Sequence, residues 1–343
     1  MNFSKSLIIF TALLTISMNV FANGDKERTD VTEKGNLLSK GFPLTIDHKY
    51  GSTTIESQPT RIVSVGYTEH EALLALGVVP IAIRDWYGDY PNSLWPWAQE
   101  ALGDSDPPYV LSSRELNFEI IASLNPDLIV GVSSGMTQKE YDTLSQIAPV
   151  IAQPADYVDY GTPWQVETRI MGQVVGKAEK AEEVVSYIED RFDSIKNSHP
   201  QFQGATAAIA FVFQNELGAY ASADSRSRLL TELGFIIPPE YDEIAGEKFY
   251  LSFSEERMDL LDTDVIIWIG VGAKGLEAMR QFTLRKTLKA TTEGREFFVG
   301  KLLGGAFSFA SPLSIDYALD ELVPALEAAI DGDPETLVPE NMR

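Results

Sequence analysis

The chain has no cysteine, and this absence excludes several kinds of chemistry. Disulfide bonds, zinc sites built on thiolates and cysteine nucleophiles cannot form. A lipid joined to a cysteine at a point of signal cleavage is excluded for the same reason. Histidine is scarce, with three residues in 343. Beyond the N-terminal segment, no apolar run is long enough to span a bilayer.

Basic residues are outnumbered by acidic ones. Lysine and arginine total 27 against 50 for aspartate and glutamate, and the net charge is −23. Such an acidic surface opposes nucleic acids and anionic membranes as partners, and it also serves solubility. The length leaves room for two domains of ordinary size.

The N-terminal residues 1–22 have the pattern of a secretory signal peptide. Lys5 precedes an apolar stretch, and Val20 and Ala22 occupy the small-residue positions before a cleavage point. A retained membrane anchor is the alternative, but the apolar core is short and the polar run NGDKERTD follows it. We expect a protein secreted to the periplasm and not lipid-anchored, whose residues 23–40 form a flexible leader.

Strand-like and helix-like segments alternate over residues 41–162. RIVSVG and DLIVGV are apolar and rich in β-branched residues, whereas TEHEALLALGV and TQKEYDTLSQIA have helical periodicity. This alternation predicts a parallel sheet with helices on both faces. It resumes over residues 200–331, before a tail at 332–343.

Residues 163–199 form one continuous helical pattern that begins at a proline. A helix of that length spans about 50 Å, which is too long for a crossover inside a small sheet. We therefore predict an α/β protein of two Rossmann-like lobes joined by one long rigid helix, with a ligand cleft between the lobes.

A G-x-S-x-G motif runs from Gly131 to Gly135 and is centred on Ser133. The motif is typical of the nucleophile elbow of α/β-hydrolases, so a secreted serine hydrolase using Ser133 is one alternative. That fold needs a histidine late in the chain. The histidine that follows Ser133 is His199, at the end of the predicted interlobe helix. The hydrolase is therefore disfavoured, and no enzyme activity is expected.

A short repeat gives the serine turn a different interpretation. DLIVGVSSG begins at Asp127 and DVIIWIGVG at Asp264, and a short helix with a glutamate eight residues earlier, Glu119 or Glu256, precedes each. The repeat is degenerate, so chance is the alternative. In its register Ser133 corresponds to a glycine, which indicates a turn where backbone can approach a bound molecule closely.

Aromatic side chains gather in the predicted loops that follow the strands. RDWYGDYPNSLWPW, ADYVDYGTPW, EKFYLSFSEE and GGAFSFASPLS contain many of them. A single ring in such a loop is as well explained by packing. Their recurrence in several strand-end loops favours a binding surface, because ligands of open α/β sheets bind at those ends.

The order and spacing of these segments resemble the periplasmic ferric-siderophore-binding proteins of ABC importers, the class with a rigid interlobe helix. The resemblance covers nearly all of the chain after the signal peptide. It rests on RIVSVGYTEHEALLALGVVPIAI, NFEIIASLNPDLIVGVSSG, YDTLSQIAPV, WQVETRIMGQVVGKAEKAEEVV, LLTELGF and SEERMDLLDTDVIIWIG. It implies a monomeric carrier that delivers a ferric siderophore to an inner-membrane ABC permease. The siderophore's own oxygens hold the iron in that family, so no cofactor or protein metal ligand is expected. A cobalamin or haem carrier of the same fold is the alternative.

The resemblance and the loop aromatics together give a set of expected ligand-binding residues. In hydroxamate-binding relatives a ligand-contacting arginine occupies the place of Arg114, which otherwise suits a surface salt bridge, and a tyrosine can occupy that of Met136. Arg84, Arg226 and Arg228 add positive charge near the loops, although the last two also suit a structural role at a helix start. Arginines with aromatic rings suit an anionic, flat-faced complex, which favours a catecholate or mixed-donor siderophore. The expected set is Tyr67, Arg84, Trp86, Arg114, Ser133, Met136, Tyr160, Phe249, Tyr250, Phe307 and Phe309.

Glu119 and Glu256 have a separate expected role. In the resembling family, glutamates at these positions dock the carrier onto arginine pockets of the permease, one lobe on each permease subunit. The alternative is that each carboxylate only stabilises the start of its own short helix.

Overall fold

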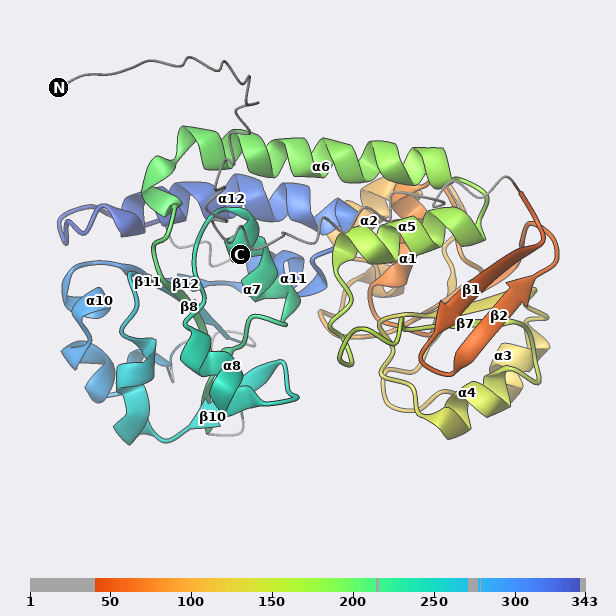
Figure 1. The fold of residues 1–343 in the computed structure, drawn as a ribbon, viewed down its shortest axis with the longest axis horizontal. Helices are drawn as coiled ribbons and strands as arrows, with labels where there is room; N and C mark the ends of the chain where they lie inside the picture. Colours follow the sequence, from red (N-terminus) through yellow and green to blue (C-terminus); the bar gives the residue numbers. More distant parts are fainter. Residues whose placement is uncertain (1–40, 214–215, 271–276, 278, 340–343) are drawn as a thin grey trace, which may run out of the picture. The chain divides into compact units, whose positions relative to one another are not determined.

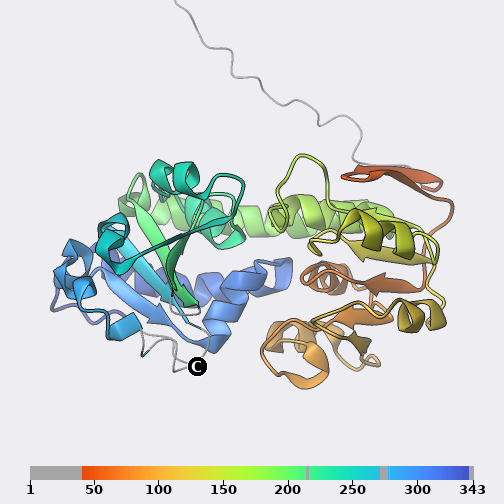
Figure 2. The same ribbon diagram turned by 90° about the horizontal axis from the view of Figure 1, so that it is seen from below.

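The computed structural model describes residues 41–213, 216–270, 277 and 279–339. The signal peptide and leader expected over residues 1–40 lie outside the described residues, as do the last four of the expected tail. Figures 1 and 2 show two sheets in separate lobes, with a long helix, α6, extending across both. The two-lobed α/β fold that the sequence predicts is confirmed.

The N-terminal lobe contains a five-stranded parallel sheet in the order β5-β4-β3-β6-β7. Strands β3, β6 and β7 are fully buried because helices cover the sheet. A β1–β2 hairpin precedes it and turns between His48 and Gly51. The strands are β1 Leu44–His48, β2 Gly51–Ile55, β3 Ile62–Ser64, β4 Ala82–Arg84, β5 Tyr109–Leu111, β6 Leu128–Gly131 and β7 Val150–Ala152. The helices are α1 Glu69–Ala75, α2 Pro96–Leu102, α3 Phe118–Ser123 and α4 Gln138–Leu144, with a 3-10 turn at Pro91–Ser93.

The C-terminal lobe contains a mixed sheet in the order β10-β9-β8-β11-β12. Strands β8, β11 and β12 are parallel, whereas β9 and β10 are antiparallel additions at one edge. The strands are β8 Ala207–Phe213, β9 Glu216–Tyr220, β10 Tyr250–Phe253, β11 Val265–Ile269 and β12 Glu296–Val299. The helices are α7 Ser225–Glu232, α8 Pro239–Ala245, α10 Lys289–Thr292, α11 Lys301–Phe309 and α12 Pro312–Ile330, with 3-10 helices at Pro200–Phe202, Glu255–Leu261 and Leu284–Thr287.

The single helix expected over residues 163–199 is wrong, because the structure divides it into α5 Trp164–Val174 and α6 Ala178–Ser198. The break lies at Gly176, whose φ of 69° is in the left-handed region that glycine enters without strain. α5 and α6 then pack against each other within the N-terminal lobe (Figure 1). Of these two helices, α6 is the one that crosses between the lobes, and its 21 residues span about 30 Å.

The two lobes are joined by side-chain packing as well as by helix α6. Trp95 and Trp97, at the start of α2, stack with centroids 5.2 Å apart and are 1% and 8% exposed. Trp95 lies 5.6 Å from Phe309 of α11, and Trp97 lies 5.7 Å from Tyr317 of α12. The α11 backbone comes so close that a Cβ at Gly305 would lie 2.1 Å from the Trp95 ring. These tryptophans therefore join the lobes and belong to the core.

This contact predicts a difference between two adjacent glycines of α11. Gly305→Ala should lower the free energy of unfolding by about 1–3 kcal/mol, because its methyl group overlaps the Trp95 ring. Gly304→Ala is the matched control. Its Cβ would meet only Ile269 and Val299 at 3.8 Å, so it should be neutral or stabilising by up to about 1 kcal/mol through helix propensity. Urea denaturation of both variants measures the difference, and equal stabilities would contradict the close packing.

Candidate ligand-binding site

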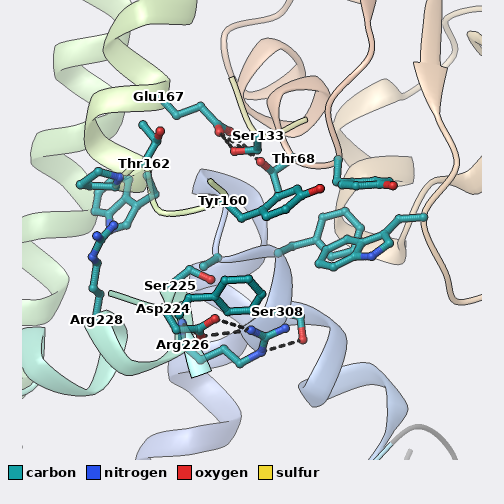
Figure 3. Close-up of a pocket in the computed structure, with 17 residues that line it drawn as sticks. Thr68, Ser133, Tyr160, Thr162, Glu167, Asp224, Ser225, Arg226, Arg228 and Ser308 are labelled. Atoms are coloured by element: carbon teal, nitrogen blue, oxygen red, sulfur yellow. Dashed lines mark hydrogen bonds and ion pairs between the residues drawn. The ribbon is translucent and has the colours of Figure 1, made fainter. Parts of the chain in front are cut away.

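A cavity of about 280 Å³ lies between the two lobes (Figure 3). The N-terminal lobe contributes the segments that follow β3, β4 and β6, and the segment from Tyr160 to Glu167 that leads into α5. The C-terminal lobe contributes the start of α7, Phe249 before β10 and the end of α11. On the side of the N-terminal lobe, the cavity is thus at the carboxyl ends of parallel strands, where α/β sheets bind ligands.

Aromatic rings form a nearly continuous series around the cavity. Trp86 lies 5.4 Å from Tyr67 and 4.8 Å from Phe309, measured between ring centroids. Tyr160 lies 6.3 Å from Tyr67 and 6.2 Å from Phe249. The series passes from the N-terminal lobe to the C-terminal lobe at two points, Trp86 with Phe309 and Tyr160 with Phe249. It gives the cavity broad apolar faces that suit a large, flat-sided ligand.

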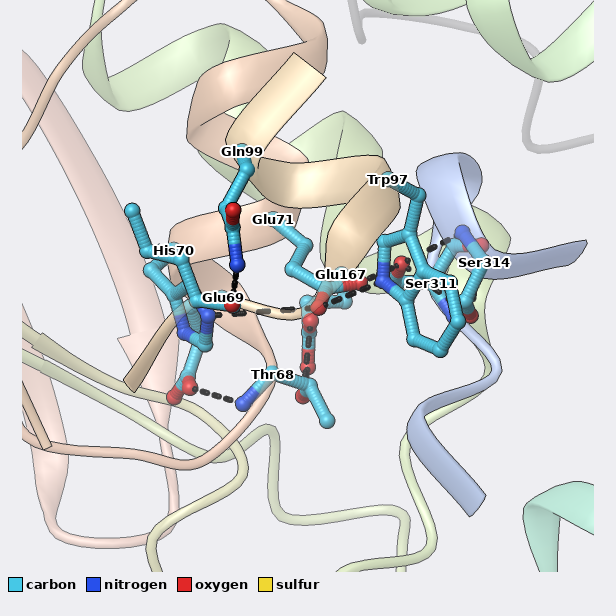
Figure 4. Close-up of polar contacts among 10 residues, drawn as sticks. Thr68, Glu69, His70, Glu71, Trp97, Gln99, Glu167, Ser311 and Ser314 are labelled. Atoms are coloured by element: carbon cyan, nitrogen blue, oxygen red, sulfur yellow. Dashed lines mark hydrogen bonds and ion pairs between the residues drawn. The ribbon is translucent and has the colours of Figure 1, made fainter. Parts of the chain in front are cut away.

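Glu167 supplies a polar end to this cavity. Its carboxyl group accepts a hydrogen bond from Ser133 Oγ at 2.6 Å and from Thr68 Oγ1 at 3.0 and 3.1 Å. The backbone N–H groups of Ser133 and Thr68 donate to a second carboxylate, Glu69, at 2.6 and 3.2 Å. Two residues therefore bridge two buried carboxyl groups, one of which lines the cavity. Figure 4 shows Thr68 in contact with both Glu69 and Glu167.

A third buried carboxyl group, Glu71, connects this network to the other lobe. It accepts hydrogen bonds from Trp97 Nε1 at 2.8 Å and from the hydroxyl of Ser311, the N-cap residue of α12. Burial raises the pKa of Glu71 to about 8. Burial, reinforced by the charge of Glu69, raises the pKa of Glu167 to about 8 as well. At neutral pH Glu167, which lines the cavity, is therefore mostly uncharged.

The surroundings of Ser133 do not match a hydrolase. Its hydroxyl donates to the Glu167 carboxyl group and not to an imidazole. His199 is paired with Glu327 at 2.6 Å, at the end of α6. His70 is fully buried, burial lowers its pKa to about 4, and neither ring nitrogen has a hydrogen-bond partner in the described part of the chain. Among the described residues, Ser133 therefore does not form the serine–histidine pair that a hydrolase needs.

The C-terminal wall presents an ion pair at the start of α7. Arg226 Nη1 contacts both oxygens of Asp224, at 2.8 and 3.0 Å, and its Nε donates to Ser308 Oγ at 3.2 Å. The guanidinium group also lies 4.2 Å from the ring centroid of Tyr220. Arg228 donates to the carbonyl of Gly161 in the other lobe, and burial lowers the pKa of Arg228.

The structure brings six of the expected ligand-binding residues together in the cavity lining. They are Tyr67, Trp86, Ser133, Tyr160, Phe249 and Phe309. The other five lie outside it, and they are Arg84, Arg114, Met136, Tyr250 and Phe307.

Backbone geometry separates two pairs of neighbours that the sequence placed together. Phe307 and Phe309 are in helix α11, where positions two apart face different sides, so Phe309 lines the cavity while Phe307 is 0% exposed. Phe249 immediately precedes strand β10, which begins at Tyr250, and only Phe249 of the two lines the cavity. Tyr250 instead lines a neighbouring cavity.

The remaining expected residues have structural positions. Arg84 lies 4.6 Å from the ring centroid of Tyr67 and donates to the carbonyls of Val65 and Ser113. Met136 is 5% exposed and packs in the core of the N-terminal lobe. Arg114 is exposed, away from the cavity lining.

Several lining residues were not predicted, and Glu167 is the most informative of them. It lies on the same helical face as Trp164 and Met171, three residues before and four after, which are both buried. An acidic residue on an inward-facing helical stripe was the signal that could have found it. The other lining residues missed are Thr68, Thr162, Pro163, Trp164, Asp224, Ser225, Ser308 and Ala310.

The two glutamates with the expected docking role are both exposed, one in each lobe. Glu119 is in the first turn of α3, whose N-cap Asn117 accepts a hydrogen bond from the N–H of Ile120 at 3.0 Å. Glu256 is in the 3-10 helix Glu255–Leu261, which is kinked at Arg257, and not in an α-helix. Among the described residues there is no cluster of acidic, histidine or cysteine side chains that could hold a metal ion. No helix within the described ranges is long and apolar enough to cross a membrane.

Comparison with known proteins identifies relatives along most of the chain. Residues 62–300 match the family model described as periplasmic binding protein. The probable siderophore-binding lipoprotein YfiY of Bacillus subtilis is 29% identical over 271 residues, which are 75% of this chain and 80% of that protein. A periplasmic solute binding protein of Mycobacterium smegmatis is 35% identical, with a TM-score of 0.73 over 84% of this chain and 98% of that one. PiaA of Streptococcus pneumoniae, solved in complex with ferrichrome, is 27% identical, with a TM-score of 0.74 over 84% of this chain and 99% of that one.

The buried carboxyl groups predict how stability depends on pH. Because burial raises the pKa of Glu71 from 4.5 to about 8, its contribution to stability is fully present below pH 4.5 and is lost as the pH rises to about 8. The free energy of unfolding should fall by about 1.4 kcal/mol per pH unit for this group across that window. Glu71→Gln should flatten the slope, as urea denaturation at several pH values would show.

An exposed glutamate gives the control for this measurement. Glu183→Gln removes a carboxylate that is paired with Lys180 at 3.0 Å on the surface, and its slope should equal that of the unaltered protein. A slope for Glu71→Gln that matches the control would mean that Glu71 is ionised in the folded protein.

Proposed function

Because the chain belongs to the periplasmic binding protein family, we propose that it captures a ferric siderophore in the cavity between its lobes and delivers it to an ABC permease of the inner membrane. The observation that carries the proposal is the aromatic series around an interlobe cavity at the strand ends. The names of relatives agree with it, since YfiY is described as siderophore-binding and PiaA was solved with ferrichrome.

The chemistry of the cavity suits a complex that arrives with its iron already chelated. Aromatic faces pack against the organic shell of such a complex, and the Ser133, Thr68 and Glu167 groups offer hydrogen bonds at one end. A chelated iron needs no protein ligand. In this proposal the protein acts as a carrier in the periplasm, and a chain without cysteine has no site for a thioether lipid anchor.

Adjacent aromatic residues provide a matched test of the cavity. Phe249 lines it and Tyr250 does not. Phe249→Ala should weaken binding of the ferric siderophore by about 1–3 kcal/mol, as for a desolvated aromatic contact, whereas Tyr250→Ala should change it much less. Titration of the protein with ferrichrome, ferric enterobactin, haem and cobalamin measures this through tryptophan quenching, since Trp86 lines the cavity. Binding of haem or cobalamin alone would overturn the siderophore proposal.

We propose further that Glu119 and Glu256 dock the carrier onto the permease. Both carboxylates are exposed, one in each lobe, and α6 together with the Trp95–Gly305 contact links the lobes that carry them. A single exposed charge pair contributes little. Two pairs with a fixed spacing reinforce each other, because the first contact gives the second a high effective concentration.

Changing both Glu119 and Glu256 to alanine should leave siderophore binding unchanged and strongly reduce iron uptake in cells that lack their own carrier. The control changes Glu100 and Glu183, also exposed, to alanine, which removes the same charge elsewhere. Normal uptake by the first double variant would refute the docking role. Loss of siderophore binding would instead place these carboxylates in the binding site.

A further inference from the structure

One of the two cationic side chains in the cavity lining is neutralised by an ion pair. Among the described residues that line it, two are arginines, Arg226 and Arg228, and two have carboxyl groups, Asp224 and Glu167. The sequence had suggested four arginines near the ligand. Arg84 and Arg114 lie outside the lining, so the cationic character of the site is much lower than that count implied.

Asp224 neutralises Arg226 within the cavity wall. The two side chains are 5% and 12% exposed, and Arg226 Nη1 contacts both carboxylate oxygens within 3.0 Å. Asp224 is also the N-cap of α7, where it accepts a hydrogen bond from the N–H of Arg226 at 2.9 Å. The cap therefore fixes the carboxylate beside the guanidinium group, and the pair presents a dipole to the cavity and no net charge.

Arg228 has acidic neighbours as well. Asp224 and Glu232 both act on it electrostatically, and Glu232 is held by a hydrogen bond from Trp164 Nε1 at 3.2 Å. Its Nη1 is already used in a hydrogen bond to the carbonyl of Gly161. Across the cavity, the carboxyl group of Glu167 is either neutral or negative, so it cannot attract an anionic ligand. The whole chain has a net charge of −23, which further opposes an anion.

We propose that Asp224 is a specificity-determining residue that restricts the cavity to ferric complexes of low net charge, the class that hydroxamate groups form with Fe³⁺. This inference rests on the proposed function. Three hydroxamates bring as much negative charge as Fe³⁺ brings positive charge, so their complex is neutral. Three catecholates bring twice as much, and their complex keeps three negative charges. Burying that trianion against a wall in which one of the two arginines is already paired is unfavourable. The class differs from the catecholate or mixed-donor siderophore that the arginine count favoured.

The test measures the dissociation constants of two probes that differ in net charge, neutral ferrichrome and trianionic ferric enterobactin. Both are measured by tryptophan quenching under one set of conditions. The unaltered protein should bind ferrichrome more tightly. Asp224→Asn releases the charge of Arg226 while an amide oxygen can still cap α7. The ratio of the two dissociation constants should then shift by about tenfold or more toward ferric enterobactin, and the shift should shrink at high salt.

Asp316→Asn is the matched control. It removes a carboxylate paired with Arg191 at 2.7 Å, outside the cavity lining, and so makes the same change in total charge. Its ratio should stay that of the unaltered protein. Asp224→Ser, which keeps an N-cap side chain and no charge, repeats the test if the asparagine variant folds poorly.

The outcomes separate this inference from the proposed function. Failure of the unaltered protein to bind either probe would overturn both. Tighter binding of ferric enterobactin than of ferrichrome would overturn the charge restriction and leave a ferric-siderophore carrier. An unchanged ratio in folded Asp224 variants, or an equal shift in Asp316→Asn, would overturn the role of Asp224.

Discussion

The packing of α2 against α11 and α12 is the constraint on which the binding site depends. Trp95 lies against the backbone of α11 because Gly305 has no side chain, and Trp97 stacks beside it and reaches Tyr317. These contacts join the two lobes directly, in addition to the crossing helix α6. The end of α11 is thereby held against the N-terminal lobe, and Phe309 is brought 4.8 Å from Trp86. The aromatic series around the cavity closes through this contact.

The hydrogen bonds of three buried carboxyl groups also extend from the contact between the lobes to the cavity. Helix α1 carries Glu69 and Glu71, which point to different neighbours because positions two apart on a helix diverge. Glu71 binds Trp97 and the N-cap hydroxyl of α12, while Glu69 binds the turn that holds Ser133. Ser133 in turn donates to Glu167 at the cavity. Buried carboxyl groups are costly unless hydrogen-bonded or protonated, and here both conditions operate.

The sequence predicted the class of fold because buried parallel strands are uninterrupted apolar runs, as DLIVGV and DVIIWIG are. It failed where a local feature overrides the pattern. The helical periodicity of residues 163–199 continues through Gly176, and only the left-handed backbone there divides α5 from α6. Strands β9 and β10 are short and antiparallel, at the edge of the sheet, and their sequences lack a long apolar run. The segment GGAFSFASPLS, predicted as a strand-end loop, is instead helical up to Phe309, and its Gly305 leaves room for the Trp95 ring.

The sequence predicted part of the candidate site. It could not show which way neighbouring side chains point, or which charged side chains pair with each other. Aromatic residues after strands were a sound signal for where the cavity would be, but the sequence did not say which of two neighbouring rings faces inward. Phe309 and Phe249 could be distinguished from Phe307 and Tyr250 only once the helix and the strand were known. The ion pair of Asp224 with Arg226 was equally hidden. Residues two apart within a helix do not meet, and these two do so because Asp224 is the N-cap, outside the helix, with an extended backbone. A count of arginines therefore overestimated the positive charge of the site.

The ion pair of Asp224 with Arg226 is preorganised. The N-cap position fixes Asp224, and contacts with Asp224, Ser308 and Tyr220 fix Arg226. A preorganised wall discriminates by the charge that a ligand brings to it, since neither partner can turn away without losing its other contacts.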